Sequence, residues 1–197
     1  MMRQNVVRLL GMGVLVIATA AAAVTVALSH PPTVEQLARD GYLGDPDTWP
    51  EHAKFLGRPA PALELTDWHG KPVTAADMRG KIVLVDFWAT WCGPCLAAVP
   101  HTNDIVTKYA DRGVVIVGAC GGGEEGTMGQ LAGELGMRYP TGKASEATTK
   151  AWGVQFWPHY AVIDRDGTLR ATGIKPDYVE RVIQALLDEG GPTTAPQ

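Results

Sequence analysis

Cysteine is scarce in this chain, with 3 cysteines among 197 residues. So few cysteines exclude a scaffold held together by several disulfides, and they leave one working pair and one further thiol. Basic residues are not in excess, because 17 Lys and Arg stand against 21 Asp and Glu, for a net charge of −4. This balance predicts no nucleic-acid partner. Internal repeats are also absent, so the length predicts one domain with a segment appended to it.

Charge is missing from residues 9–28, where two threonines are the only polar side chains. A helix of that length spans roughly 30 Å, the thickness of a bilayer core. Arg3 and Arg8 precede the segment and should stay in the cytoplasm, which places the rest of the chain on the far side. We expect residues 1–29 to be a membrane anchor or, alternatively, a cleaved signal peptide, because the segment also contains a run of small residues. No cysteine follows the apolar segment directly, so a lipoprotein is not expected.

The remaining chain divides into a linker, a domain and a tail. Residues 30–54 mix charges with prolines and glycines, and they predict a stalk with one short helix at 34–39. Residues 55–188 have an ordinary globular composition and are long enough for a single packed core. Residues 189–197 predict a disordered tail.

Strand and helix patterns alternate along the domain and predict an α/β fold. Apolar runs at 82–87 and 114–117 predict buried strands around a helix at 94–109, a βαβ unit whose strands are parallel. Residues 160–163 and 169–172 flank a turn of sequence DRDG and predict a hairpin. Other expected elements are a hairpin of 62–65 with 71–73 around a turn at 67–70, an edge segment at 137–139, and helices at 75–78, 128–135, 146–152 and 178–187. We therefore expect a mixed central sheet of four or five strands flanked by helices.

Cys92 and Cys95 lie where the strand at 82–87 gives way to a helix. Free backbone N–H groups and the helix dipole favour a thiolate there, and lowering a thiol pKa from about 8.5 toward 7 makes roughly half of it nucleophilic. Pro94 suits the first helical turn, because its missing N–H would have no partner at that position. Cys95, one turn on, is placed to attack a mixed disulfide formed at Cys92. The pattern predicts thiol–disulfide exchange; the alternatives are a static disulfide and half of a zinc site, for which only Cys120 and five histidines remain as ligands.

The segment VDFWATWCGPC at 85–95 resembles the active-site segment of thioredoxin, and Pro100 matches the kinked helix of that family. The segment GRPAPALEL at 57–65 and the pair Tyr139-Pro140 resemble the TlpA/ResA-like thiol–disulfide oxidoreductases. That subgroup is extracytoplasmic, usually anchored, and shares a domain family with peroxiredoxins. The segment GVQFWP at 153–158 is similar to the family's cis-proline segment. The resemblance implies a thioredoxin-like fold over the domain.

The same resemblance implies roles for individual residues. Cys92 would be the attacking thiol and Cys95 the resolving one, the two forming a redox-active disulfide. Pro158 would be the cis-proline that faces the pair, blocks metal binding and presents backbone to a substrate peptide. The other substrate-binding residues would be Trp91, Gly93, Pro94 and Trp157. Asp86 matches a buried acid beneath the cysteines, where burial should raise its pKa so that it exchanges a proton with Cys95; the alternative is a hydrogen-bonded core acid without a catalytic role.

Three positions leave the interpretation open. Many ResA-like members carry a glutamate three residues after the second cysteine, whereas this chain has Ala98, so the resemblance does not settle a role in cytochrome c biogenesis. Cys120 ends the second parallel strand, so it lies either on the active-site edge of the sheet or simply in the core as a small residue. His159 follows the expected cis-proline, and it either touches the thiols or is a polar residue at the start of a strand.

Two other functions fit parts of the pattern. Peroxiredoxins place Thr or Ser three residues, and Pro seven residues, before the reactive cysteine, but this chain has Ala89 and Val85 there. A copper-binding module would pair the two cysteines with a distal histidine such as His159 or His101, although the Gly-Pro spacer and the expected cis-proline argue against it.

The function expected from the sequence is reduction of protein disulfides outside the cytoplasm. The Gly-Pro spacer resembles that of reducing thioredoxins, and an oxidising compartment requires electrons from a membrane partner. We expect a monomer that acts on protein thiols and disulfides and needs no metal or other cofactor.

Overall fold

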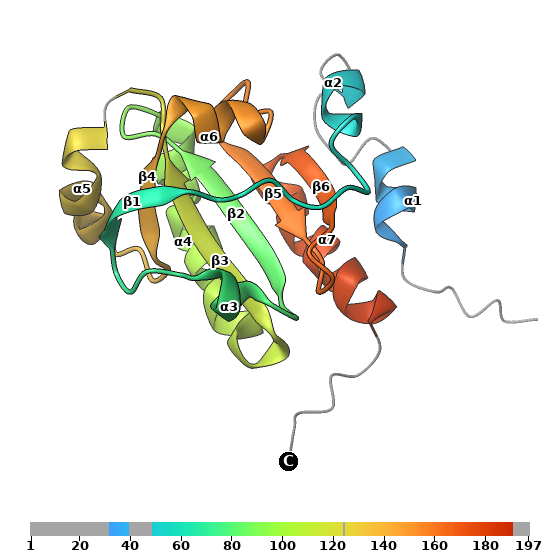
Figure 1. The fold of residues 1–197 in the computed structure, drawn as a ribbon. Helices are drawn as coiled ribbons and strands as arrows, with labels where there is room; N and C mark the ends of the chain where they lie inside the picture. The colour runs from blue at the N-terminus through green and yellow to red at the C-terminus, as the bar shows by residue number, and fades with distance from the viewer. Residues whose placement is uncertain (1–31, 40–48, 124, 191–197) are drawn as a thin grey trace, which may run out of the picture. The chain divides into compact units, whose positions relative to one another are not determined.

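The computed structural model describes residues 32–39, 49–123 and 125–190, in which six strands form one mixed sheet. The order across the sheet is β1-β4-β3-β2-β5-β6 (Figure 1). The strands are β1 (Leu65–His69), β2 (Ile82–Trp88), β3 (Val114–Cys120), β4 (Thr141–Ala144), β5 (His159–Ile163) and β6 (Leu169–Ile174). This is the expected α/β architecture of a thioredoxin-like fold.

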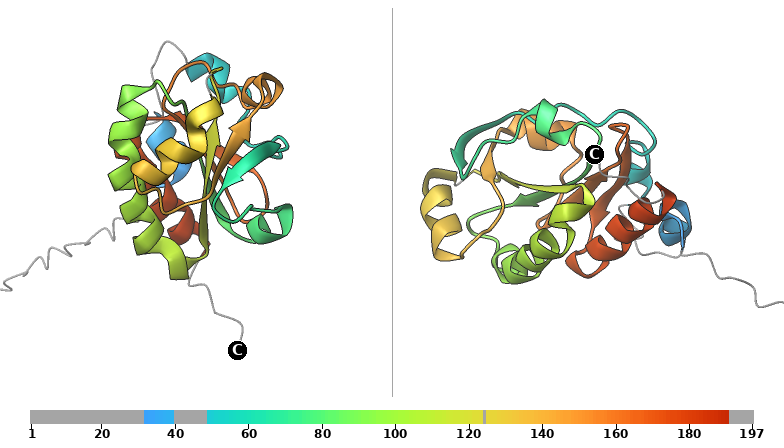
Figure 2. Two further views of the ribbon diagram at one scale, coloured as in Figure 1. Left: turned by 90° about the vertical axis from the view of Figure 1, so that its left-hand side faces the viewer. Right: turned by 90° about the horizontal axis from the view of Figure 1, so that it is seen from below.

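Helices cover both faces of this sheet (Figure 2). The two long helices, α4 (Gly93–Tyr109) and α7 (Pro176–Glu189), pack on one face, and the short helices α3 (Ala75–Met78) and α6 (Glu146–Ala151) lie on the other. The remaining helices are α1 (Val34–Arg39), α2 (Trp49–Ala53) and α5 (Met128–Glu134), with 3-10 turns η1 (Ala110–Arg112) and η2 (Glu125–Thr127). The predicted helix kink position is also present, since Pro100 lies inside α4.

The central strand β2 decides which side chains meet the cysteines. All seven of its residues are buried, because it lies between β3 and β5 and both faces of the sheet are covered there. Side chains alternate along a strand, so Leu84, Asp86 and Trp88 face the side covered by α4, and Phe87 faces the opposite side. The parallel β2–α4–β3 unit expected from the sequence is confirmed. The carboxyl ends of β2 and β3 and the start of β5 meet at one edge of the sheet.

The strand count and the first hairpin were wrong in the sequence-based prediction. The sheet has six strands instead of four or five, and residues 62–65 and 71–73 form no hairpin. β1 starts at Leu65 and pairs antiparallel with β4, which itself forms at 141–144 and not at 137–139. The contact is close, because a Cβ on Gly142 would lie 2.9 Å from the Leu65 Cβ. This pairing joins segments far apart in the sequence, so the local turn pattern did not reveal it.

The described part of the expected stalk is packed against the domain, which corrects the prediction for those residues. The short helix at 34–39 forms as expected, and its Val34 and Leu37 are only 1% and 2% exposed in the core beside α7. Arg170 of β6 adds ion pairs to Glu35 of α1, at 2.6 Å, and to Glu189 of α7, at 3.0 Å. α1 therefore completes the core and is not an extended spacer.

The expected anchor at 1–29 and nearly all of the expected tail at 189–197 lie outside the described residues. Within the residues that the structure describes, no helix is both long and apolar enough to cross a membrane.

The burial of α1 gives a stability prediction. We expect Leu37→Ala to lower the free energy of unfolding by about 2–4 kcal/mol, because the substitution leaves a cavity in a packed core. Chemical denaturation followed by circular dichroism measures this loss. Gln36→Ala, at an exposed position of the same helix, should cost much less. Equal and small losses for both variants would contradict the packing of α1.

Candidate active site

A disulfide joins Cys92 and Cys95 at the start of α4, with an S–S distance of 2.08 Å. Cys92 is the residue that caps the helix, and its Sγ accepts a hydrogen bond from the Cys95 backbone N–H at 3.2 Å. Pro94 lies in the first helical turn, where its lack of an N–H costs no hydrogen bond. The expected pairing and its location at a helix N-terminus are confirmed. A helix N-terminus generally favours a thiolate over a thiol.

The sulfurs are shielded, and exposed residues surround them. Cys92 and Cys95 are each 4% exposed, whereas Trp91 is 51% exposed. Gly93 and Pro94 are also exposed, and a Cβ built on Gly93 would meet nothing within 4 Å. A partner therefore meets the Trp91–Pro94 surface before it reaches the sulfurs.

The loop after β3 holds two tryptophans in place. The Trp91 Nε1–H donates to the Gly122 carbonyl at 3.2 Å. The Trp91 and Trp157 rings meet edge to face, with their centroids 6.5 Å apart. A Cβ on Gly122 would lie 3.1 Å from the Trp91 ring, and one on Gly121 would lie 3.0 Å from the Trp157 ring. These close approaches leave little room for a larger residue at either position, so the loop at 121–123 positions both rings.

The Trp157–Pro158 peptide bond is cis, as the resemblance implied. Pro158 immediately precedes β5, whose first residue His159 pairs with Phe87 near the end of β2. The cis-proline segment therefore lies at the same edge of the sheet as the start of α4, and the contact of Trp157 with Trp91 ties the two segments together.

Asp86 is the acid beneath this edge. Its side chain is 3% exposed on the face covered by α4, and the Tyr139 hydroxyl donates a hydrogen bond to its Oδ2 at 2.8 Å. Burial raises the pKa of Asp86 to about 7, and interactions with tyrosine hydroxyls offset only part of that rise. A carboxyl group with this pKa can both take and release a proton near neutral pH, which is what proton exchange with a thiol requires.

Tyrosines around Asp86 were not predicted as site residues. Tyr160 lies directly opposite Asp86 in the β2–β5 register, and its hydroxyl is 3.5 Å from Thr102 Oγ1 of α4. Tyr139 appeared in the sequence only as part of a family resemblance. The alternation of side chains along β5 separates Tyr160 from its neighbours in the strand. That Tyr160 shares a face with Asp86 follows only from the register between β2 and β5.

His159 lies on the face of the sheet away from the cysteines. It is fully buried, its Nε2 is 2.8 Å from Thr172 Oγ1, and its ring packs against Phe87 and against His52 of α2. Burial, aided by the neighbouring His52, lowers the pKa of His159 to about 3, so the ring is neutral. The interpretation of His159 as a polar residue at a strand start is therefore the correct one, and it does not complete a copper site with the cysteines.

Cys120 and Ala98 both lie inside the core. Cys120 is fully buried and pairs in register with Trp88, so it sits at the active-site edge of the sheet and is also a small core residue. Ala98 is 9% exposed, and its carbonyl accepts a hydrogen bond from Thr102 Oγ1 at 3.3 Å. Across the described part of the chain, no three His, Cys, Asp or Glu side chains come together as a metal-binding group.

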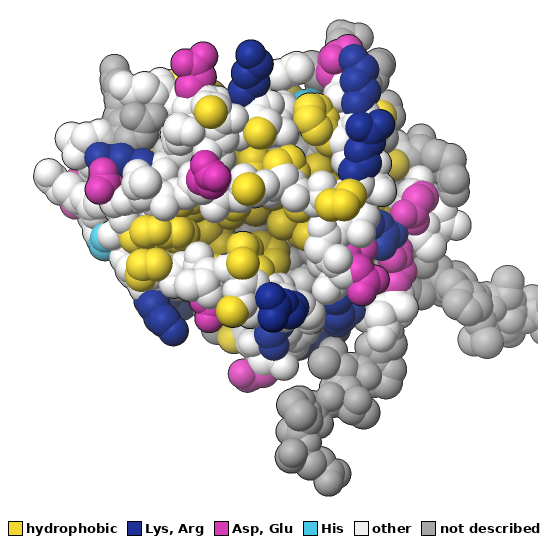
Figure 3. Space-filling view, in the orientation of Figure 1, with side chains coloured by type: hydrophobic (Ala, Val, Ile, Leu, Met, Phe, Trp, Pro, Cys, Tyr) yellow, Lys and Arg dark blue, Asp and Glu magenta, His cyan; other side chains and the backbone are white. Residues whose placement is uncertain are grey.

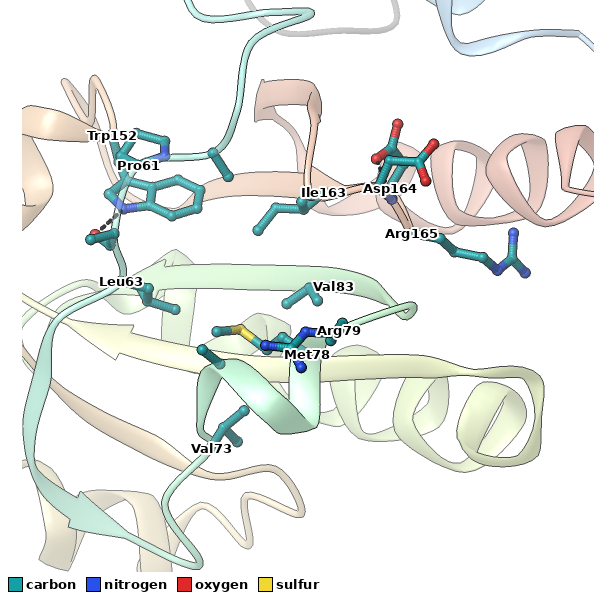
Figure 4. Close-up of a pocket in the computed structure, with 15 residues that line it drawn as sticks. Pro61, Leu63, Val73, Met78, Arg79, Val83, Trp152, Ile163, Asp164 and Arg165 are labelled. Atoms are coloured by element: carbon teal, nitrogen blue, oxygen red, sulfur yellow. Dashed lines mark hydrogen bonds between the residues drawn. The ribbon is translucent and has the colours of Figure 1, made fainter. Parts of the chain in front are cut away.

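An apolar groove of about 510 Å³ opens on the face opposite to the disulfide. Its walls are the segment 60–63, α3 and the turn between β5 and β6, with Val83 and Ile163 of the sheet between them (Figure 4). Apolar side chains gather in a hollow on this face in the space-filling view (Figure 3). Val83 alternates with Leu84 and Asp86, so the groove is separated from the cysteines by the sheet.

Comparison with known proteins identifies relatives of this domain. The Redoxin family model matches residues 55–187. The thiol-disulfide oxidoreductase ResA of Bacillus anthracis is 30% identical over 113 residues, which are 57% of this chain and 65% of the relative. ResA of Bacillus cereus (strain ATCC 10987 / NRS 248) is 32% identical over 119 residues, covering 59% of this chain and 68% of that protein. The chain thus spans slightly less than two thirds of the Bacillus anthracis relative.

A mycobacterial protein and a solved structure extend the comparison. Protein DipZ of Mycobacterium tuberculosis (strain CDC 1551 / Oshkosh) is 31% identical over 147 residues, which are 68% of this chain but 21% of DipZ. A crystal structure described as a thiol:disulfide interchange protein DsbE, from Chlorobium tepidum, superposes with a TM-score of 0.61 at 27% identity. That match covers 67% of this chain and 97% of the DsbE chain.

The raised pKa of Asp86 gives a pH prediction. Between pH 4 and 7 the folded protein holds a proton on Asp86 that the unfolded chain releases, because the pKa rises from 3.8 to about 7 on folding. This stabilising contribution is complete below the unfolded pKa and is lost as the pH rises through about 7. We expect the unfolding free energy of the wild type, minus that of Asp86→Asn, to increase as the pH falls, by at most about 1.4 kcal/mol per pH unit.

Urea unfolding of both proteins at several pH values measures this difference. The difference is needed because the lowered pKa of His159 acts in the opposite direction over the same range and cancels between the two proteins. A difference that stays constant from pH 4 to 7 would show that the Asp86 carboxyl titrates with an ordinary pKa.

Proposed function

This chain belongs to the Redoxin family, as a TlpA/ResA-like member of the thioredoxin superfamily, and we propose that it exchanges protein thiols and disulfides through Cys92 and Cys95. The observation that carries this proposal is the Cys92–Cys95 disulfide at the N-terminus of α4, on the same face of the sheet as the buried Asp86. A static disulfide would need neither an acid with a pKa of about 7 nor an exposed tryptophan beside it.

In the reducing direction, the Cys92 thiolate attacks a substrate disulfide. One substrate sulfur bonds to Cys92 and the other leaves as a thiolate, so the substrate disulfide becomes a mixed disulfide with the protein. The N-terminus of α4 stabilises the attacking thiolate through its backbone N–H groups, one of which already contacts the Cys92 sulfur. We propose that the substrate chain binds to the surface around the cysteines, which is formed by Trp91, Gly93, Pro94, Trp157 and Pro158.

Cys95 then resolves the mixed disulfide. Its thiol gives its proton to the Asp86 carboxylate, its sulfur bonds to Cys92, and the second substrate sulfur leaves as a thiolate. Proton transfer at a pKa of about 7 is efficient in both directions near neutral pH, so the same acid serves the reverse reaction when the pair is reduced again.

We further propose that the protein is a reductase located outside the cytoplasm and tethered or exported through residues 1–29. The uncharged segment at 9–28 and the two arginines before it support this location. In an oxidising compartment a reductase must be reduced again by an electron donor at the membrane, and we propose such a partner together with a monomeric state.

Trapping the intermediate tests the function. We expect Cys95→Ser to accumulate a covalent mixed disulfide between Cys92 and a substrate protein, because the attack remains but the intramolecular resolving thiol is gone. A positioned neighbour exceeds dilute external thiols in effective concentration by about five orders of magnitude or more, so the adduct should persist. Non-reducing electrophoresis and mass spectrometry identify it.

The trap has two controls in the same chain. Cys92→Ser combined with Cys95→Ser should trap nothing, and Cys120→Ser combined with Cys95→Ser should trap as before, because Cys120 is buried. If no adduct depends on Cys92, while the reduced protein binds one equivalent of Cu(I) tightly, the copper-binding function is correct instead.

The role of Asp86 is tested by separating the two steps. We expect Asp86→Asn to slow resolution on the order of 100-fold at neutral pH and to change the first attack by much less, because the asparagine cannot accept the Cys95 proton. Stopped-flow measurements with a chromogenic model disulfide resolve both rates. Equal rates for the variant and the wild type would leave Asp86 a purely structural residue.

A further inference from the structure

The Asp86 carboxyl group lies in a polar cluster contributed by four separate elements. Asp86 comes from β2, Tyr160 from β5 and Thr102 from α4, and Tyr139 comes from the segment between α5 and β4. All four side chains are at most 3% exposed. Such a cluster fixes its members more tightly than any one of them is fixed alone.

The two oxygens of this carboxyl group are not equivalent. Oδ2 accepts the Tyr139 hydroxyl at 2.8 Å, whereas Oδ1 is buried and accepts no hydrogen bond of ordinary length among the described residues. The Tyr160 hydroxyl also favours the carboxylate form, but it is a weaker partner than Tyr139 because no hydrogen bond of ordinary geometry joins it to Asp86. Burial and the nearby carboxylate hold the pKa of Tyr139 far above its usual range, so its hydroxyl keeps its proton and acts as the donor to Asp86. Since Oδ2 is occupied by that donor, a proton arriving at the carboxyl group has its place on Oδ1.

Helix α4 also fixes the segment that carries Tyr139. Asn103 of α4 donates from Nδ2 to the Gly136 carbonyl at 2.9 Å and accepts the Arg138 backbone N–H on Oδ1 at 2.8 Å. On the other side of Tyr139, the Pro140 carbonyl accepts the Gly118 N–H of β3 at 2.8 Å. Helix α4, which carries Cys95, is therefore hydrogen-bonded to the segment that carries Tyr139, and the Tyr139 hydroxyl in turn contacts Asp86.

We propose that Tyr139 is a positioning residue for the resolving step, which holds the Asp86 carboxyl group by Oδ2 so that Oδ1 takes the proton of Cys95. This inference rests on the proposed function and adds a residue to it. In the step, the Cys95 S–H bond and the mixed disulfide bond break, while the Cys92–Cys95 disulfide and the Oδ1–H bond form. The charge of the Asp86 carboxylate passes to the departing substrate thiolate, and Tyr139 keeps its own proton throughout.

Tyr139→Phe tests this inference, because it removes the hydroxyl and keeps the ring. We expect resolution to slow by about 10-fold at neutral pH, with little change in the first attack by Cys92. The pH at which resolution reaches half its maximal rate should move upward, because the lost hydrogen bond favours the carboxylate. The 13C NMR titration of the Asp86 carboxyl group should move upward with it.

Tyr109→Phe is the matched control. Tyr109 is also a buried tyrosine whose hydroxyl donates to a carboxylate, that of Glu180 on α7, at 2.9 Å. Its variant loses a hydroxyl-to-carboxylate hydrogen bond of similar length away from Asp86, and it should leave both the rate of resolution and the pH profile unchanged.

A double variant separates positioning from general support of the fold. If Tyr139 acts through Asp86, then Tyr139→Phe should have no further effect on resolution in an Asp86→Asn background. An equal slowing in both backgrounds, or an unchanged NMR titration of Asp86 in Tyr139→Phe, would overturn the inference. Failure of the wild type to form any Cys92-dependent mixed disulfide would instead refute the proposed function, and the two failures are therefore distinguishable.

Discussion

Removal of water from one carboxyl group is the constraint on which the rest of the site depends. Asp86 lies in a strand whose seven residues are all buried, where an ionised carboxylate loses its hydration. Tyrosine hydroxyl groups, and not a cation, stabilise this carboxylate. The charged and neutral forms of Asp86 therefore have similar free energies near neutral pH. A lysine or arginine in place of Tyr139 would hold the carboxylate ionised, and a wholly apolar pocket would hold it protonated. Only the intermediate arrangement leaves the proton free to move near neutral pH.

The same edge of the sheet gathers every part of the site, although the parts are distant in the sequence. The end of β2 leads into the Cys92–Cys95 pair, the loop after β3 seats Trp91 and Trp157, and Pro158 opens β5. Parallel pairing of β2 with β3 and antiparallel pairing with β5 bring these three segments together. The geometry of the strands, more than any single contact, therefore builds the active surface.

Prediction from the sequence succeeded where the signal was local. The apolar run of β2, the cysteine spacing and the proline in the first turn of α4 are contiguous, and they fixed the central βαβ unit and the disulfide. The cis-proline at Pro158 followed from family resemblance and not from any local pattern. The pairing of β1 with β4, the face taken by His159 and the approach of Tyr160 to Asp86 depend on strand registers, which no local window of the sequence contains. The position of Tyr139 depends on hydrogen bonds between its segment and α4, which are equally distant in the sequence.

Gly93 and Gly121 both lie at this edge of the sheet, but they differ in how much room a larger side chain would have. Space around Gly93 is open, whereas a side chain at Gly121 would collide with Trp157 and Thr149. A side chain at Gly93 therefore meets no steric obstacle, while one at Gly121 requires its neighbours to move. A substitution at Gly93 can therefore change the reduction potential of the Cys92–Cys95 pair while the surrounding fold is kept.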